Sequence, residues 1–377
     1  KTFRRFDSIK YKRIILNKIL LGGVKMKKLI AIALVLLLSF SVFAQGAAES
    51  AAKSTLKVGM VTDSGTIDDR SFNQGTYEGV KKAADELGLE CTYLKPSGTT
   101  TTDYLTAISD LYDAGYRFIA CPGYLFADAV SQAQAMYTDL NLVIIDDALT
   151  AGIGANTVAV VFKEQESGFL AGLATALKLN EGSVGFIGGL EIPAVQKFNW
   201  GFQQGVKYAN DNYGTKIEMD PSNFVYSGSF SDLALGQQLA TAMFNKGVDV
   251  IFAAAGGVGV GAINEAKNRR LSGEDVWVVG VDVDQYSVGD MGNGSSCILT
   301  SAMKDVSGVA YDMVKACVDG TYPGGKLLTL GIAENRAGIP ASNPNLNADI
   351  EKIVSEVSAL VSQGKVVVAA SSDGLIK

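Results

Sequence analysis

From Leu56 onward, short runs of β-branched and other apolar residues alternate with longer stretches in which apolar positions recur at helical spacing. Strands that alternate with helices in this way are typical of βαβ units and parallel sheets, so we predict an α/β protein. The predicted strands are 56–62, 90–94, 117–121, 141–146, 157–161, 183–188, 217–226, 249–254, 276–281 and 297–302, with a last apolar strand at 366–368. The predicted helices are about 72–88, 102–115, 125–139, 164–179, 194–212, 231–247, 258–270, 304–319 and 348–363.

The strand and helix pattern occurs twice. The first four strands and their helices form one unit, which ends in the small-residue stretch 148–154. Each half opens with a strand, a polar aromatic loop and a helix, at 62–75 in the first half and at 187–205 in the second. Because no long Gly/Ser/Pro linker separates the halves, we expect two domains that share more than one crossover and enclose a cleft.

The N-terminal 44 residues have a different pattern. Lys1 is not an initiator and the first methionine is Met26, so we interpret residues 1–25 as upstream sequence translated by mistake. Residues 26–44 have the pattern of a secretory signal peptide, with two lysines, an apolar run and small residues before a cleavage point after Ala44. About 333 residues then remain, which fits two domains better than one.

A membrane anchor is the alternative interpretation of the same segment. Its apolar run, residues 29–43, is shorter than the roughly 20 residues that a helix needs to cross a bilayer. A lipid anchor would need a cysteine just after the small residues, and the first cysteine of the chain is Cys91. We therefore expect an exported protein that is soluble after cleavage and carries no lipid anchor.

Composition makes several functions poor candidates. The residues after Ala44 hold 23 Lys and Arg against 38 Asp and Glu, so we expect no binding to nucleic acids or anionic membranes. The chain contains no histidine and no GxxxxGK[ST] loop, which favours binding over hydrolysis. We expect buried free thiols, no metal site and no cofactor, because the cysteines show no CxxC spacing. They are Cys91, Cys121, Cys297 and Cys317.

The loop at 63–74 lies between the first predicted strand and the first predicted helix. In open α/β sheets, ligands bind at this end of a strand. Ser71 is the predicted N-cap of the helix. A calcium loop is an alternative interpretation of Asp63, Asp68 and Asp69. Their spacing does not fit an EF-hand, however, and Asp68 and Asp69 suit caps and turns better. Asp63, at the strand end, faces the expected cleft.

Phe72 and Phe230 occupy similar places in the two halves. Each belongs to a polar loop between a strand and a helix. Either ring could be a packing residue of the core, as most aromatic side chains are. A flat ring held between the two would instead be stacked on both faces, which is worth roughly 1 to 3 kcal/mol per base.

A glycine-rich segment at 257–262 gives the main competing hypothesis. It matches G-x-G-x-x-A after a strand, and Asp282 follows at the end of the next strand, as in dinucleotide-binding folds. The segment lies in the middle of the second half, however, and its glycines could equally serve close packing or approach to a ligand. Asp146, Asp282 and Lys304 all lie at or just beyond strand ends, where a charge is either ligand-facing or solvated.

Four segments together carry a resemblance to a known family. They are 57–74, 191–198, 226–232 and 280–285. In this order they resemble the basic membrane protein (BMP) family of ABC-transporter substrate receptors, most closely its purine nucleoside receptors. The resemblance covers nearly all of the chain after the leader.

The resemblance implies a type I periplasmic-binding fold, with two doubly wound parallel-sheet lobes joined by a hinge. We expect lobe 1 at 55–158 plus about 305–325, and lobe 2 at 159–304 plus about 326–377. By the family pattern, two phenylalanines sandwich the purine, three polar residues address its edge, and an acid and a lysine bind the ribose. The implied ligand-binding residues are Asp63, Phe72, Asn73, Asp146, Phe230, Gly256, Asp282 and Lys304.

The implied function is that of a monomeric, non-enzymatic periplasmic receptor. It would capture adenosine, guanosine or inosine and deliver it to an ABC permease in the inner membrane. Two alternatives remain open at this stage. One is a sensor subunit for a membrane receptor, and the other is a secreted nucleoside-modifying enzyme that uses Asp63 and Asp146 as acid and base.

Overall fold

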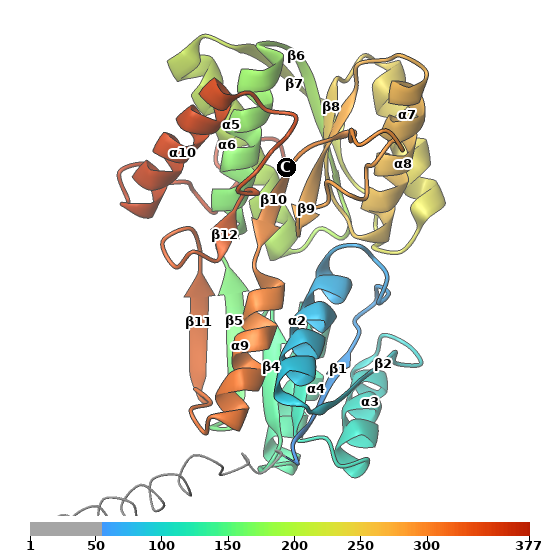
Figure 1. Cartoon of the computed structure of the whole chain (residues 1–377), viewed down its shortest axis with the longest axis vertical. Coiled ribbons are helices and arrows are strands. Elements are labelled where there is room, and N and C mark those ends of the chain that lie inside the picture. Colours follow the sequence, from blue (N-terminus) through green and yellow to red (C-terminus); the bar gives the residue numbers. More distant parts are fainter. Residues whose placement is uncertain (1–54) are drawn as a thin grey trace, which may run out of the picture. The chain divides into compact units, whose positions relative to one another are not determined.

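Two six-stranded sheets organise residues 55–377, the part of the chain that the computed structural model describes (Figure 1). The first sheet consists of β1 (Lys57–Val61), β2 (Glu90–Leu94), β3 (Phe118–Pro122), β4 (Asn141–Ile145), β5 (Thr157–Phe162) and β11 (Lys326–Leu330). The second consists of β6 (Glu181–Gly188), β7 (Lys216–Tyr226), β8 (Val250–Ala254), β9 (Trp277–Asp282), β10 (Ile298–Lys304) and β12 (Ala337–Gly338). Our interpretations of residues 1–25 and 26–44 lie outside the described residues.

The two sheets have the same strand order when their strands are matched along the chain. The order is β11-β5-β4-β3-β1-β2 in the first sheet and β12-β10-β9-β8-β6-β7 in the second. Strand pairs in both sheets are parallel, except that β12 runs antiparallel to β10. Parallel neighbours need crossover connections, which is why helices separate most strands. The predicted α/β architecture is confirmed.

Helices cover both faces of each sheet. On the first sheet, α2 (Phe72–Leu87) and α9 (Val306–Val318) cover one face, and α3 (Thr101–Asp113) and α4 (Ala127–Met136) cover the other. On the second sheet, α5 (Glu164–Leu179), α6 (Pro193–Tyr213) and α10 (Ala348–Ser362) oppose α7 (Leu233–Asn245) and α8 (Gly257–Leu271). A short 3-10 helix, η1 (Tyr124–Phe126), precedes α4. We call each sheet with its helices a lobe.

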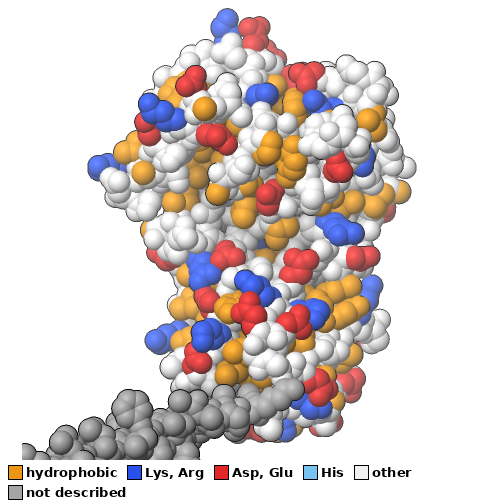
Figure 2. Space-filling model, in the orientation of Figure 1, with side chains coloured by type: hydrophobic (Ala, Val, Ile, Leu, Met, Phe, Trp, Pro, Cys, Tyr) orange, Lys and Arg blue, Asp and Glu red, His pale blue; other side chains and the backbone are white. Residues whose placement is uncertain are grey.

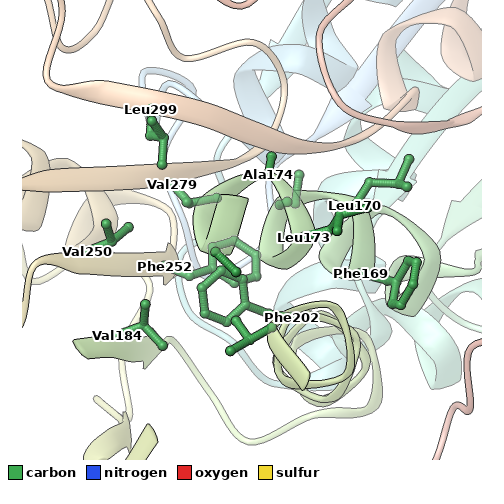
Figure 3. Packing of buried hydrophobic residues seen from close by; sticks show 14 of the residues in the cluster. Phe169, Leu170, Leu173, Ala174, Val184, Phe202, Val250, Phe252, Val279 and Leu299 are labelled. Carbon is green, nitrogen blue, oxygen red and sulfur yellow. The ribbon is translucent and has the colours of Figure 1, made fainter. Parts of the chain in front are cut away.

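Apolar side chains from α5, α6, α10 and five strands form the main core of the second lobe. Figure 3 shows the rings of Phe202 and Phe252 beside each other, with centroids 5.2 Å apart. Glycines let α5 and α6 approach closely, since a Cβ atom at Gly172 would lie 2.1 Å from the carbonyl oxygen of Phe202. This packing fixes α6, whose first turn reaches the cleft described below.

The predicted strands and helices agree with the structure to within a few residues, with two corrections. The predicted strand 366–368 is wrong: Val367 is 83% exposed, and the following Ala369 exchanges two hydrogen bonds with the Gln204 side chain on α6. β11 and β12 were not predicted. The helix predicted from 304 begins at Val306, because β10 continues to Lys304.

The chain passes between the lobes at 162–164, 304–306 and 330–337. We expected the stretch from about 326 to lie in the second lobe. Instead, β11 pairs with β5 in the first sheet, so the last passage follows Leu330.

The surface of the described residues carries charges of both signs. Figure 2 shows acidic and basic side chains mixed over both lobes on the face that it presents. Among residues 55–377, no helix combines the length and the apolar character needed to cross a bilayer.

Candidate ligand-binding site

A cleft lies between the lobes, at the carboxyl ends of the strands of both sheets. It encloses about 580 Å³ of empty space, part of which is open to solvent. All eight residues predicted to bind ligand line this cleft: Asp63, Phe72, Asn73, Asp146, Phe230, Gly256, Asp282 and Lys304. The structure thus brings the predicted set together, while the binding role of each residue remains a prediction.

Ten further residues line the cleft and were not predicted: Asp69, Gly123, Tyr124, Ile192, Ala194, Val195, Phe198, Ala254, Ala255 and Val281. Most of them follow strands or begin helices. The rule that ligands bind at the carboxyl ends of strands could have found Gly123 and Ala255, which directly follow β3 and β8. Phe198 lies inside α6, and its only signal in the sequence is that it ends segment 191–198, which carries the family resemblance.

Asp63 and Asn73 hold each other in place on the wall of the first lobe. Asp63 Oδ1 accepts hydrogen bonds from the Gly65 N–H at 2.7 Å and from Asn73 Nδ2 at 2.9 Å. Asn73 Oδ1 in turn accepts from the Asp63 N–H at 3.1 Å. Burial raises the pKa of Asp63 to about 6, although these hydrogen bonds oppose the shift.

The side chain of Asp69, and not that of Ser71, caps the start of α2. The Asp69 carboxylate accepts from the backbone N–H groups of Ser71, Asn73 and Gln74 at 2.9 to 3.1 Å. Ser71 occupies the N-cap position, but its hydroxyl makes no cap bond and donates to Asp282 Oδ2 at 2.5 Å. The predicted N-cap position of Ser71 is confirmed, but its side chain makes no cap bond, because a nearby carboxylate satisfies the same N–H groups.

Phe72 and Phe230 enter the cleft from opposite lobes, and both are partly buried. Phe72 is the first residue of α2, and Phe230 lies in the loop between β7 and α7. The Phe230 ring lies over Gly189, where an added Cβ atom would come within 2.1 Å of a ring carbon. The ammonium group of Lys304 is 4.5 Å from the centre of the Phe72 ring.

Lys304 lies at the centre of a buried cluster of charges. Its ammonium group donates to Asp146 Oδ2 and lies 3.6 Å from Asp282 Oδ1 and 3.8 Å from Glu164 Oε1. Glu164 also pairs with Lys197 at 3.0 Å. Lys304 and Glu164 are 3% and 1% exposed, so water screens these charges little.

Burial and mutual attraction oppose each other in this cluster. Burial raises the pKa of Asp282, and it raises the pKa of Glu164 to about 7, while the Lys304 charge lowers both. Burial alone would lower the pKa of Lys304, but the carboxylates of Asp146, Asp282 and Glu164 raise it above its ordinary value. Lys304 is therefore charged at any physiological pH.

Asp146 and Asp282 occupy equivalent positions, after the fourth strand of the first lobe and at the end of the matching strand of the second. Both have left-handed backbone conformations, with φ of +67° and +64°. Such φ values are uncommon outside glycine and gather at binding sites. Asp146 Oδ1 is buried and has no hydrogen-bond partner among the described residues. This oxygen is free to accept a hydrogen bond from a ligand.

The glycine-rich segment 257–262 opens α8 and serves helix packing. A Cβ atom at Gly261 would lie 2.1 Å from the carbonyl oxygen of Leu233, and one at Gly236 would lie 1.9 Å from that of Val258. The close contact of α7 with α8 accounts for Gly261, and an added Cβ atom at Gly257 or Gly259 would lie 3.1 Å or 3.3 Å from the carbonyl oxygen of Phe230 or Ala253. Within residues 55–377, no group of three or more acidic or cysteine side chains is placed to hold a metal ion.

Solved structures that share the fold include solute-binding proteins. The structure resembles an ABC transporter solute-binding protein from Aeropyrum pernix K1, with a TM-score of 0.73, 23% identity and coverage of 84% of this chain and 95% of that one. A second, from Conexibacter woesei, gives a TM-score of 0.64 at 18% identity, covering 84% and 99%. The protein therefore has the type I periplasmic-binding fold, as predicted.

Sequence relatives narrow the class to a family. Residues 56–370 match the family model Bmp, described as ABC transporter substrate-binding protein PnrA-like. "ABC transporter nucleoside-binding protein BmpA" of Lactococcus lactis subsp. cremoris is 31% identical over 357 residues, 91% of this chain and 99% of its own. "Basic membrane protein A" of Borreliella burgdorferi is 33% identical over 351 residues, 92% and 97%. The chain belongs to the Bmp family and is an ABC transporter substrate-binding protein, which confirms the predicted resemblance.

Proposed function

We propose that the protein is a non-enzymatic periplasmic receptor that captures purine nucleosides and delivers them to an ABC permease in the inner membrane. One observation carries this proposal. Two aromatic rings from opposite lobes, a set of carboxylates and a lysine line a single cleft. Such a combination suits a ligand with a flat, apolar ring system and a polyhydroxylated part.

The base would lie between Phe72 and Phe230. Stacking of a base on an aromatic side chain is worth roughly 1 to 3 kcal/mol. Purines carry N–H groups on the ring edge, and Asp63 and Asp146 provide carboxylate oxygens on the same wall of the cleft. The unpartnered oxygen of Asp146 is a suitable acceptor for one of them.

The ribose would lie against Asp282 and Lys304. A carboxylate that accepts hydrogen bonds from two neighbouring hydroxyls gains roughly 1.5 to 3 kcal/mol from each. Asp282 is 7% exposed, so a ligand without the sugar would leave it poorly solvated, with Ser71 and Lys304 as its partners and part of its accepting capacity unused. We therefore expect free bases to bind more weakly than nucleosides.

The Lactococcus relative supports the choice of nucleoside, because its name describes nucleoside binding. The absence of histidine from the sequence agrees with a role without catalysis. An enzyme that used Asp63 and Asp146 as acid and base would convert a bound nucleoside. Recovery of unchanged nucleoside after long incubation with the protein excludes that alternative.

Mass spectrometry of the denatured, purified protein tests the proposal most cheaply, since binding proteins often copurify with their ligands. We expect a purine nucleoside to be released. Titration of ligand-stripped, refolded protein should rank adenosine, guanosine or inosine above adenine and ribose. Tightest binding of a free base or a free sugar contradicts the proposal.

A further inference from the structure

Two chain segments from opposite lobes contact each other directly beside the cleft. Residues 70–75 belong to the first lobe and residues 282–285 to the second. The Ser71 hydroxyl donates to Asp282 Oδ2 at 2.5 Å, and Gln285 Nε2 donates to the carbonyl oxygen of Arg70 at 2.8 Å. Neither Ser71 nor Gln285 lines the cleft, although Asp282, which accepts from Ser71, does.

Both side chains are held in one orientation. Ser71 is fully buried and Gln285 is 2% exposed. Gln285 Oε1 accepts from the Val281 N–H at 2.9 Å, and the Gln285 N–H donates to Ser301 Oγ at 3.1 Å. With its oxygen engaged inside the second lobe, the amide can only present its N–H group to the first lobe.

The contact between segments 70–75 and 282–285 also shows close packing and backbone strain. A Cβ atom at Gly75 would lie 2.8 Å from Val283 Cγ1, so only a glycine lets the two segments approach this closely. Arg70 and Asp282, which provide the two acceptors, both have left-handed backbones with φ of +56° and +64°. Strained residues of this kind persist where the surrounding contacts hold them, as in ligand clamps and switches.

We propose that Ser71 and Gln285 are positioning residues that form an interlobe latch. The latch holds Asp282 in its ligand-facing orientation, and it stabilises the conformation in which the lobes are together. Its two hydrogen bonds exist only when segments 70–75 and 282–285 meet. Their loss therefore shifts the equilibrium toward separated lobes, whether or not a ligand is bound.

The latch has a kinetic signature. A ligand enters the cleft when the lobes are apart and leaves after they separate, so the latch mainly slows dissociation. A single net hydrogen bond changes an equilibrium by about fivefold, and a bond to a charged acceptor changes it more. We expect each latch variant to raise the dissociation rate by about five- to tenfold, with a smaller effect on association.

Two variants break the latch without changing a residue that lines the cleft. Ser71→Ala removes the donor to Asp282. Gln285→Glu keeps an acceptor for the Val281 N–H but, in its ionised form, cannot donate to Arg70. Matched controls are Ser109→Ala, which removes a hydroxyl bonded inside the first lobe, and Gln363→Glu, which adds the same charge at an exposed position.

Small-angle X-ray scattering of the ligand-stripped chain and stopped-flow dissociation of a purine nucleoside test the proposal together. We expect both latch variants, and neither control, to show a larger radius of gyration and faster dissociation. Scattering profiles identical to wild type in both latch variants overturn the latch. Only the kinetic measurement rests on the proposed function. If wild-type protein binds no nucleoside, that function fails while scattering still decides the latch.

Discussion

The two lobes have the same strand order but form chemically different walls of the cleft. The first lobe contributes fewer of the residues that line the cleft, and most of them are polar. They include Asp63, Asp69, Asn73 and Asp146. The second contributes mainly apolar side chains, including Ile192, Val195 and Phe198, and only two charged ones, Asp282 and Lys304. One framework thus provides a polar surface on one side and an apolar surface with a single ion pair on the other.

The difference arises in particular loops and not in the sheets. Asp146 and Asp282 lie at matching strand ends with nearly the same φ, so this position is shared by both lobes. After the first strand of each lobe the two diverge. The first lobe carries Asp63 there, whereas the second carries Gly189, which makes room for the Phe230 ring.

Loss of Lys304 should have the largest effect, because it removes the cation that the acids of both lobes share. Lys304→Met leaves Asp146, Asp282 and Glu164 without their common partner. Breaking a buried ion pair in this way typically costs about 3 to 5 kcal/mol. We expect a fall of that size in the free energy of unfolding, measured with urea, and no detectable ligand binding. Lys352→Met, at an exposed position, is the control, and an equal fall there contradicts the cluster's importance.

Loss of either aromatic ring should weaken binding without unfolding the protein. Phe72→Ala and Phe230→Ala each remove one stacking surface, at an expected cost of roughly 1 to 3 kcal/mol in binding free energy. Calorimetric titration with a purine nucleoside measures it. Phe126→Ala, a substitution in the core, is the contrast, since we expect it to lower stability and leave affinity unchanged. A Phe72 or Phe230 variant that behaves like Phe126→Ala would show that its ring belongs to the core.

The polar wall should also give the protein a pH-dependent stability. The pKa of Asp63 is about 6 in the folded protein and lies near 3.8 in the unfolded chain, so the folded state binds the proton more tightly. Stability should therefore fall as the pH rises from about 4 to 6. In Asp63→Asn this fall should be smaller by roughly 1 to 3 kcal/mol. Urea unfolding at several pH values measures the effect, with Asp110→Asn as the exposed control.

Gly189→Ala should give the smallest effect and tests the apolar wall alone. The new methyl group would displace the Phe230 ring, because no Cβ atom fits at 2.1 Å from a ring carbon. Overpacking of this kind typically costs about 1 kcal/mol or somewhat more. We expect a loss of that size in nucleoside affinity, with a nearly unchanged melting temperature. A much larger loss of stability than of affinity would mean that Gly189 serves the fold and not the ring.

Long, periodic elements could be predicted from the sequence, and short or edge elements could not. The apolar stripe of α2, with Val80, Ala83 and Ala84 buried, predicts a helix because residues three and four positions apart lie on one face of a helix but not of a strand. β11 is an edge strand with mostly exposed side chains, so its sequence carries little of the pattern that marks a strand. The apolar run at 366–368 resembled a strand, but Val367 points to solvent and no partner strand is available to it among the described residues.

Some residues of the candidate site could likewise be predicted from the sequence, and others could not. Residues at strand ends, such as Asp63, Asp146 and Asp282, could be found because the fold sends all those ends to one cleft. Ser71 is at the predicted N-cap, but the partner of its hydroxyl was not found, because a local capping pattern cannot reveal a bond to a residue 211 positions away. Glu164 was missed for a similar reason. Its partners, Lys197 and Lys304, come from distant parts of the chain.

Lys304 is also the last residue of β10, where the chain passes from the second lobe to α9 in the first. The Lys304 ammonium, which is proposed to hold the sugar, thus lies next to one of the three hinge segments between the lobes. A rotation of a few degrees moves the rims of the cleft far but displaces this ammonium little. A bound nucleoside would then keep its contact with Lys304 while its other contacts in the cleft are lost. Release would begin at the rim of the cleft and end at this residue.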